Sequence, residues 1–304
     1  MKCHSRLTLP PPPAPGARVA VVAPAGACNP ADLAAGLEIF RAAGLDPHLD
    51  PSVYGRQGYL AGADTDRAAA LMKAFLDPAV AAIACARGGY GSMRLLDRLD
   101  FLEIARHPKR LLGFSDLSAL LWALNRRAGL AGFHGPTVAS LAEADRDTVV
   151  GLDLFMADDP HLTLSLARGR VLAAGWAVGT LCGGNLTTLC HLMGTPFAPC
   201  FHGAIVVLED RAEAPYRVDR LLTQLRLGGA LDGARAVVLG DFTECGGTAE
   251  LHPVFEDRLG DLGIPVMTGL PVGHGPCNLT LPLGLNACLD TSRQTLAVGR
   301  IGRP

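Results

Sequence analysis

The segment Gly113-Phe114-Ser115-Asp116 places a hydroxyl group where it could act as a nucleophile. It follows the short apolar run Arg110–Phe114, which predicts a buried strand, and Ser115 opens an expected helix through Arg127. A serine on such a turn is exposed above the sheet, and the free amides of the helix N-terminus point towards any oxyanion that forms beside it. Serine and aspartate are also common helix caps, so this segment alone fits a structural role as well.

Two other side chains could complete the machinery that a serine nucleophile requires. Glu209 follows the apolar run Ile205–Leu208, and a carboxylate at the end of a buried strand could orient a histidine. His274 lies between Gly273 and Gly275, which leave its imidazole room to move a proton. Taken singly, Glu209 also suits a solvated loop and His274 a structural position, so their association is a hypothesis.

A third candidate is the glycine-rich segment Arg87-Gly88-Gly89-Tyr90-Gly91, which follows the apolar run Val80–Ala86. Glycines allow the backbone to approach a ligand, and exposed amides there can bind an anion, although a plain turn fits equally well. The spacing does not match a dinucleotide fingerprint, which disfavours a nucleotide-dependent oxidoreductase. His134, within Phe133-His134-Gly135-Pro136, ends another expected strand and could line the same cleft.

The elements that must position these residues alternate along the first half of the chain. Strands are expected at 17–23, 45–49, 80–86, 110–114 and 132–134, and helices at 31–43, 64–76, 92–98 and 115–127. Such alternation predicts a parallel sheet covered on both faces, which binds ligands beyond the carboxyl ends of its strands. The loops 23–26, 87–91 and 113–116 all fall at those ends.

The second half has a different texture and predicts a separate, strand-rich domain. Strands are expected at 203–208, 234–240, 264–267, 286–289 and 295–298, with helices at 186–193 and 216–227. The proline-rich residues 1–16 are expected to form a loose, disordered arm. We therefore divide the chain into the arm, a nucleophile domain at 17–140, a linker region at 141–170 and a C-terminal domain at 171–304.

Composition excludes several classes of function. The 304 residues carry a formal net charge of −2 and no basic stripe, so no nucleic-acid partner is expected. No run of 18 apolar residues predicts a membrane span, and no apolar signal core follows Lys2 and Arg6, so we expect an unexported protein. The nine cysteines are scattered and no HExxH motif occurs, so neither a metal nor another cofactor is expected.

Taken together and in this order, these segments resemble the LD-carboxypeptidase family of serine peptidases, which includes the microcin C self-immunity peptidases. The resemblance covers roughly residues 17–300. The matching segments in the first half are 22–26, 86–91, 113–116 and 133–136. Those in the second half are 179–186, 208–210, 215–220 and 271–275.

The resemblance implies an α/β fold with a flavodoxin-like parallel-sheet N-terminal domain and a smaller strand-rich α/β C-terminal domain. It assigns Ser115, Glu209 and His274 as the catalytic triad, with glutamate and histidine supplied by the C-terminal domain. The backbone amides of Gly89 and Asp116 would form the oxyanion hole. Members that act on peptidoglycan fragments work in the cytoplasm during wall recycling and are commonly homodimers.

The expected reaction is removal of the terminal D-Ala from muropeptide tetrapeptides, through an acyl-enzyme at Ser115. The substrate's terminal carboxylate needs a cation or amides. The sequence does not choose among four candidate arginines and one histidine, which are Arg87, Arg211, Arg217, Arg220 and His134.

Two other functions stay open at this point. A microcin-type immunity peptidase would cleave peptidyl- or aminoacyl-nucleotides and would need an aromatic side chain to stack on the base, for which Trp176 is a candidate. A non-catalytic ligand-binding module on the same fold would bind its ligand without turnover.

Overall fold

The computed structural model describes residues 7–299, which divide into two compact units. The N-terminal unit comprises residues 7–158 together with 278–281, and the C-terminal unit comprises residues 159–277 and 282–299. The boundary between the two units therefore lies within residues 141–170, the stretch expected to be a linker. A short segment of the second half of the chain, residues 278–281, belongs to the N-terminal unit.

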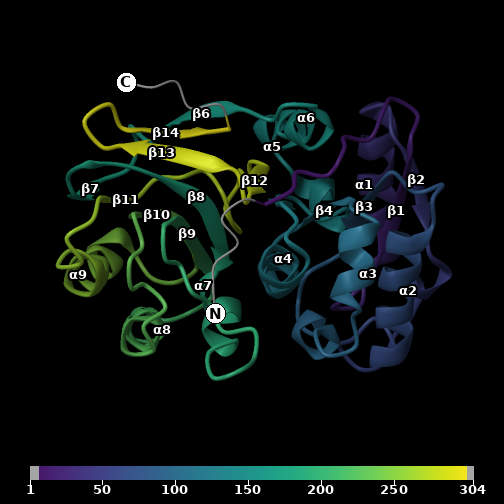
Figure 1. The fold of residues 1–304 in the computed structure, drawn as a ribbon, viewed down its shortest axis with the longest axis horizontal. Coiled ribbons are helices and arrows are strands. Elements are labelled where there is room, and N and C mark those ends of the chain that lie inside the picture. The colour runs from purple at the N-terminus through teal and green to yellow at the C-terminus, as the bar shows by residue number, and fades with distance from the viewer. Residues whose placement is uncertain (1–6, 300–304) are drawn as a thin grey trace. The chain divides into compact units, whose positions relative to one another are not determined.

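The N-terminal unit is built on a six-stranded sheet with the order β12-β5-β4-β3-β1-β2. Its strands are β1 (Arg18–Val22), β2 (Asp46–Leu49), β3 (Ala82–Cys85), β4 (Arg110–Gly113), β5 (Gly132–His134) and β12 (Leu281–Leu283). The first five pair in parallel, and their order 2-1-3-4-5 is that of flavodoxin-like sheets. Strands β4, β3, β1 and β2 lie side by side in Figure 1. The predicted flavodoxin-like α/β class is confirmed.

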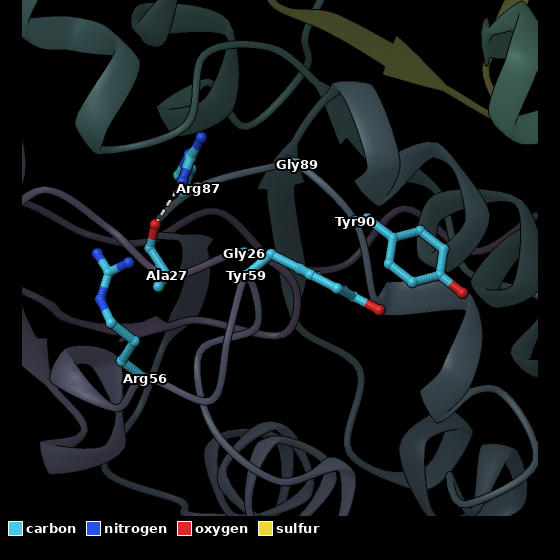
Figure 2. A pocket seen from close by; sticks show the side chains of 7 residues that line it. All are labelled: Gly26, Ala27, Arg56, Tyr59, Arg87, Gly89 and Tyr90. Carbon is cyan, nitrogen blue, oxygen red and sulfur yellow. Dashed lines mark hydrogen bonds between the residues drawn. The ribbon is translucent and has the colours of Figure 1, made fainter.

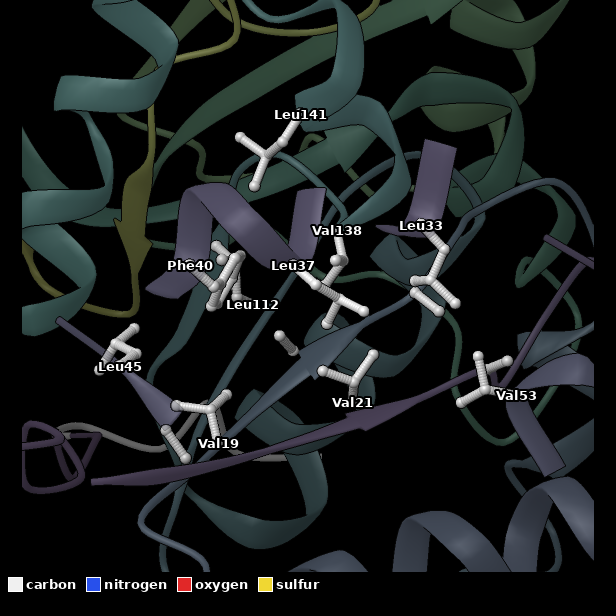
Figure 3. Packing of buried hydrophobic residues seen from close by; sticks show 14 of the residues in the cluster. Val19, Val21, Leu33, Leu37, Phe40, Leu45, Val53, Leu112, Val138 and Leu141 are labelled. Carbon is white, nitrogen blue, oxygen red and sulfur yellow. The ribbon is translucent and has the colours of Figure 1, made fainter. Parts of the chain in front are cut away.

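Helices flank this sheet, and the two longest bury apolar residues that recur every three or four positions. They are α1 (Pro30–Ala42), α2 (Asp64–Leu76), α3 (Phe101–Arg106), α4 (Ser118–Ala123), α5 (Arg146–Val150) and α6 (Leu152–Met156). On α1, Leu33, Leu37 and Phe40 are fully or almost fully buried and pack against β1 (Figure 3). Asn29 caps α1 by accepting a hydrogen bond from Ala31 N at 2.9 Å.

The segment after Ser115 differs from the single helix expected over 115–127. A 3₁₀ turn covers Ser115–Leu117, α4 follows, and a π-helical stretch covers Leu124–Ala128 before Gly129 ends the helix with φ +67°. The tight first turn and the wide last turn are local adjustments of one helical run. The short α3 lies in a stretch for which the sequence predicts no helix or strand.

Part of the expected N-terminal arm is held against the N-terminal unit. Thr8 N donates to Gly129 O at 2.8 Å, and Ala131 N donates to Thr8 O at 2.8 Å. The Arg110 guanidinium, which is fully buried, donates through Nε to Pro10 O at 3.0 Å. Hydrogen bonds to the backbone of Thr8 and Pro10 thus hold this part of the arm. Residues 1–6 of the expected arm lie outside the described part of the chain.

The C-terminal unit contains an eight-stranded mixed sheet with the order β6-β14-β13-β8-β9-β10-β11-β7. Its strands are β6 (Leu162–Ser165), β7 (Val171–Ala173), β8 (Trp176–Asn185), β9 (Ala204–Arg211), β10 (Ala236–Thr243), β11 (Val266–Met267), β13 (Asn286–Asp290) and β14 (Thr295–Val298). Strands β8 to β11 pair in parallel, and the remaining pairs are antiparallel. The helices are α7 (Leu186–His191), α8 (Pro215–Leu227) and α9 (Thr248–Leu259).

Strand β8 was not predicted from the sequence, although it is the longest strand of this sheet. Glycines at 179, 183 and 184 weaken the strand signal there. The structure requires Gly183, which has φ +130°, because a Cβ at this position would lie 1.9 Å from Val207 O. Within the described residues, no helix is long and apolar enough to cross a membrane.

Candidate active site

Ser115 lies two residues after the end of β4, in a backbone conformation that side-chain-bearing residues rarely adopt. Its φ is +64°, in the left-handed region, where an L-residue with a Cβ is strained. Such strain is tolerated where the surrounding structure enforces it, and it concentrates at functional positions. Its side chain is partly exposed between buried neighbours, as a nucleophile must be.

The residue after Ser115 locks this turn. The Asp116 carboxylate accepts a hydrogen bond from Ser92 N at 2.8 Å, and Ser92 Oγ donates to Asp116 O at 2.6 Å. Burial raises the pKa of Asp116 above its usual value, although these hydrogen bonds oppose the shift. The proposed oxyanion donor, the amide of Asp116, is therefore carried by a residue with little freedom to move.

The glycine-rich loop passes directly beside Ser115 in the same unit. A Cβ built on Gly88 would lie 3.0 Å from Ser115 Cβ and 3.2 Å from Ser115 Oγ, so a side chain here would fit only if Ser115 moved slightly away. Gly89, the other proposed oxyanion donor, is exposed with φ +97°. Of the loops that were expected at the carboxyl ends of strands, this one therefore lies beside Ser115.

Glu209 lies on β9 in the C-terminal unit and is 0% exposed. Its position is shaped by β10, whose register with β9 shifts between Leu239 and Phe242. Such a bulge bends a strand and redirects its side chains. Here the bulge leaves Gly240 opposite Glu209, where a Cβ would lie 2.6 Å from Val272 O, so the loop carrying His274 can pass directly over the strand.

Backbone hydrogen bonds fasten that loop to the bulge. Leu270 N donates to Leu239 O at 3.1 Å, and Asp241 N donates to Val272 O at 2.9 Å. Gly273, with φ +121°, has no room for a side chain, because a Cβ there would lie 2.8 Å from Glu209 Oε2. His274 follows at once and donates through Nδ1 to Glu209 Oε2 at 2.8 Å.

This hydrogen bond sets the chemistry of the imidazole. An ionised carboxylate only accepts hydrogen bonds, so Nδ1 carries the proton and Nε2 of the neutral ring is left as the basic atom. His274 is mostly buried, with 14% of its side chain exposed, and Glu209 is completely buried. The pair is arranged as the base and orienting acid of a hydrolase.

Two further carboxyl groups surround this pair. Burial raises the pKa of Asp210, which accepts hydrogen bonds from Asn185 Nδ2 at 2.9 Å and Thr187 Oγ1 at 2.7 Å. Burial, followed by the charge of Glu209, also raises the pKa of Asp241. Asp241 faces the histidine loop, since a Cβ on Gly275 would lie 1.9 Å from its Oδ2. Sequence reasoning missed Asp241, which offers no motif of its own.

The expected carboxylate-binding candidates fall into different surroundings. In the C-terminal unit, Arg211 pairs with Glu244 at 3.1 Å, Arg217 pairs with Glu213 at 3.5 Å, and Arg220 lies over the Tyr216 ring at 5.4 Å.

In the N-terminal unit, His134 is 1% exposed, with its ring 6.0 Å from that of Phe114. Arg87 is exposed, donates to Ala27 O, and lines a pocket with Arg56, Tyr59 and Tyr90 (Figure 2). Arg56 and Tyr59 were not singled out from the sequence, because their loop lacks a recognisable motif.

The structure thus brings together Glu209 and His274 in one unit, and Ser115 with the glycine-rich loop in the other. The C-terminal unit by itself positions the Glu209–His274 pair, and the N-terminal unit by itself positions Ser115. The assignment of all three residues to one catalytic centre remains a proposal.

Comparison with known proteins finds a family model for each half of the chain. The LD-carboxypeptidase N-terminal domain matches residues 19–135, and the LD-carboxypeptidase C-terminal domain matches residues 178–289. The murein tetrapeptide carboxypeptidase of Pseudomonas aeruginosa is 36% identical over 91% of this chain and 94% of its own length. The microcin C7 self-immunity protein MccF of Escherichia coli is 26% identical over 79% of this chain and 80% of its own length.

A solved structure shows the same fold. The muramoyltetrapeptide carboxypeptidase of Oxalobacter formigenes is 32% identical, with a TM-score of 0.82 over 94% of this chain and 100% of that chain. Identity at this level over nearly the whole length, together with both domain matches, decides the family. The chain belongs to the LD-carboxypeptidase family of serine-type carboxypeptidases.

Proposed function

We propose that this enzyme removes the terminal D-Ala from muropeptide tetrapeptides, with Ser115 as the nucleophile. The observation that carries the proposal is the buried Glu209–His274 pair, joined at 2.8 Å, in a chain that also holds Ser115 on a strained turn. The relatives named murein tetrapeptide carboxypeptidase and muramoyltetrapeptide carboxypeptidase support this choice of substrate. The proposal includes a cytoplasmic location and a homodimer, both implied by the family resemblance.

The steps follow from general chemistry. His274 Nε2 takes the proton from Ser115 Oγ as the hydroxyl attacks the carbonyl of the L-residue that precedes D-Ala. Glu209 holds the ring in this tautomer and stabilises its charged form. The amides of Gly89 and Asp116 bind the oxyanion of the tetrahedral intermediate.

Bond cleavage then releases the D-amino acid. The protonated His274 donates its proton to the departing amine, which leaves the acyl group on Ser115 as an ester. A water molecule, deprotonated by His274, attacks this ester and frees the shortened peptide. Rigid backbone around both halves of the triad keeps the cost of reorganisation during these steps small.

The test is release of free D-Ala from L-Ala-γ-D-Glu-diaminopimelate-D-Ala by wild type and by Ser115→Ala. We expect release by wild type and a fall in kcat of about 10⁴–10⁶-fold in Ser115→Ala. Circular dichroism of both proteins controls for folding. Near-full activity of the variant would exclude Ser115 as the nucleophile, and a wild type that releases no D-Ala would exclude the tetrapeptide as substrate.

A second candidate is cleavage of an aminoacyl- or peptidyl-nucleotide, favoured by the similarity to the microcin C7 self-immunity protein. Trp176 is 51% exposed, but it is the first residue of β8, whereas the last residue, Asn185, is the one that pairs with Glu209. The register of β8 therefore gives no support to Trp176 as the side chain on which a base would stack. Turnover of an aminoacyl sulfamoyl adenylate, measured beside the tetrapeptide, separates the two substrates.

A further inference from the structure

A pocket of about 510 Å³ opens among three loops of the N-terminal unit (Figure 2). The loops are residues 23–28 after β1, residues 55–61 before α2, and residues 87–91 after β3. The first and third follow the carboxyl ends of parallel strands, where sheets of this type bind their ligands. The steps proposed above use only the backbone of the third loop, and they assign no role to the pocket itself.

The pocket is formed before any ligand arrives, because backbone hydrogen bonds join its loops. Gly26 N donates to Gly88 O at 2.9 Å, and Ala27 N donates to Tyr59 O at 3.1 Å. Gly26 also makes room for the other loops, since a Cβ on it would lie 2.8 Å from Gly88 O. A preformed site avoids the entropic cost of ordering its loops on binding.

The side chains of the pocket select an anionic ligand. Arg56 and Arg87 contribute two guanidinium groups, and none of the residues within 7–299 that line the pocket is acidic. Figure 2 shows these arginines on either side of Ala27, with the rings of Tyr59 and Tyr90 on the other side of Gly26. The planar guanidinium matches the geometry of a carboxylate, which it binds through two parallel hydrogen bonds.

The two tyrosines add an apolar wall. Their ring centroids are 5.8 Å apart, with an angle of 57° between the ring planes, so the two rings pack against each other. Tyr59 is 65% and Tyr90 47% exposed, which is more than either large ring needs for its hydroxyl alone. A ligand with an aliphatic stem beside its carboxylate fits this combination of charge and ring surface.

The pocket adjoins the proposed nucleophile within one unit. Gly88, which joins Arg87 and Gly89, comes so close that a Cβ on it would lie 3.2 Å from Ser115 Oγ. One residue of an extended peptide spans about 3.5 Å, so a carboxylate one or two residues from the attacked carbonyl reaches the neighbouring loop.

We propose that this pocket binds a carboxylate of the substrate peptide, held by Arg56 together with Arg87, with Tyr59 and Tyr90 against the adjoining aliphatic carbons. The inference rests on the proposed function, because it takes a peptide attacked at Ser115 as the ligand. A muropeptide offers carboxylates from two sources, the terminal D-residue and the acyl part. The chemistry is the same for both, and the experiment separates them.

The experiment measures binding without turnover, by calorimetry on Ser115→Ala. The probes are the tetrapeptide L-Ala-γ-D-Glu-diaminopimelate-D-Ala, its C-terminal amide, and a form amidated at the free carboxylates of its acyl part. Each is titrated into the parent, into the parent with Arg56→Gln, and into the parent with Arg106→Gln. Arg106 is a matched control, because it is 70% exposed on α3 and pairs with Glu103.

We expect Arg56→Gln to raise Kd for the unmodified tetrapeptide by about 10–100-fold, the range for a hydrogen bond between charged groups. Arg106→Gln should leave Kd unchanged. If the Arg56→Gln effect disappears with the C-terminal amide, the pocket holds the terminal carboxylate. If it disappears with the other amidated peptide, the pocket holds a carboxylate of the acyl part.

Three results would overturn the inference: an unchanged Kd in Arg56→Gln, an equal loss with all three peptides, or a parent that binds none of them. D-Ala release by wild type reports on the proposed function separately. If wild type releases D-Ala but Arg56→Gln leaves Kd unchanged, the proposed pocket is excluded and the proposed function stands. If Arg56→Gln weakens binding only of peptides that carry the carboxylate, and wild type releases no D-Ala, the pocket stands and the proposed function is excluded.

Discussion

Glu209 illustrates how function shapes this protein at the scale of a residue. A fully buried carboxylate is costly unless it is paired and hydrogen-bonded. Its Oε2 accepts the hydrogen bond from His274, whereas its Oε1 has no hydrogen-bond partner among the described residues. A group retained in such an incompletely satisfied position is more easily explained by chemistry than by stability.

The kinetics of a Glu209→Gln variant test whether the Glu209 carboxylate takes part in the reaction. The amide has nearly the same volume, but it lacks the negative charge that stabilises a protonated imidazole. We expect kcat to fall by about 10²–10⁴-fold with KM little changed, because the loss concerns the transition state. Glu213→Gln, in the segment after β9, is the control and should retain wild-type kcat. A Glu209→Gln enzyme with wild-type kcat would remove Glu209 from the mechanism.

At the scale of elements, α2 holds the loops of the site in place through one buried arginine. Arg67 is 1% exposed and donates to Pro24 O in the first loop and, at 3.0 Å, to Gly91 O in the third. Asp64, in the first turn of α2, pairs with Arg67 and, at 2.8 Å, with Arg94. The strand-end loops therefore depend on an ion pair that lies outside the proposed chemistry.

The variant Asp64→Asn should destabilise the fold in a pH-dependent manner. Burial works to raise the pKa of Asp64, but the hydrogen bonds and charges of Arg94 and Arg67 outweigh it and hold the pKa below its usual value. A depressed pKa stabilises the fold above the unfolded-state value of about 3.9, and this contribution is lost as pH falls through the folded-state pKa. Because Arg67 stays buried while solvent screens the carboxylate of Asp64, we expect a loss of about 1–2 kcal/mol near neutral pH.

Urea denaturation between roughly pH 3 and pH 7 measures this difference in the free energy of unfolding. The gap between wild type and Asp64→Asn should narrow below about pH 4. Asp66→Asn changes an exposed carboxyl group in the same helical turn and should stay within about 0.5 kcal/mol of wild type. A gap that is constant with pH would show that the ion pair does not carry the stability.

At the scale of the whole molecule, the chain returns to its first unit after building most of its second. Residues 278–281 belong to the N-terminal unit, and β12 supplies the edge strand beside β5. Asn278 N donates to Thr148 Oγ1 at 2.8 Å, and both residues are buried. The N-terminal unit is therefore completed by residues far along the chain, so its stability depends on the second half having been synthesised.

Thr148→Val tests this connection, because valine keeps the volume but removes the acceptor. We expect the free energy of unfolding to fall by about 1–3 kcal/mol, the cost of leaving a buried N–H without its acceptor. D-Ala release per folded molecule should not change. Thr163→Val, at an exposed position on β6, controls for the loss of a hydroxyl group. If wild type and Thr148→Val are equally stable, the hydrogen bond from Asn278 N to Thr148 Oγ1 does not stabilise the N-terminal unit.

Local pattern was sufficient for much of the fold. Helix α2 and strand β14 occupy the residues expected from periodicity, and the alternation of the first half predicted a parallel sheet. The motifs around Ser115 and His274 carried the resemblance to the family. These features were accessible because strand and helix periods, turn residues and short motifs are all properties of adjacent residues.

Other features depend on contacts between distant residues. Strand β8 carries glycines that lower its strand propensity, and only the close approach of Val207 explains why Gly183 is needed there. Likewise, Arg56 and Tyr59 line a pocket only because backbone hydrogen bonds join their loop to Ala25 and Ala27.

The fold class, the family and the residue types that could perform the reaction were predictable from the sequence, because they depend on local patterns and motifs. Tertiary structure alone decided that Glu209 reaches His274 across 65 positions, since a bulge in β10 and a glycine at 273 bring the loop onto β9. It also decided which arginines meet carboxylates of the protein and which face a pocket. The physical reason is that pairing, burial and charge environment arise from close packing of segments whose separation in sequence carries no information about their distance in space.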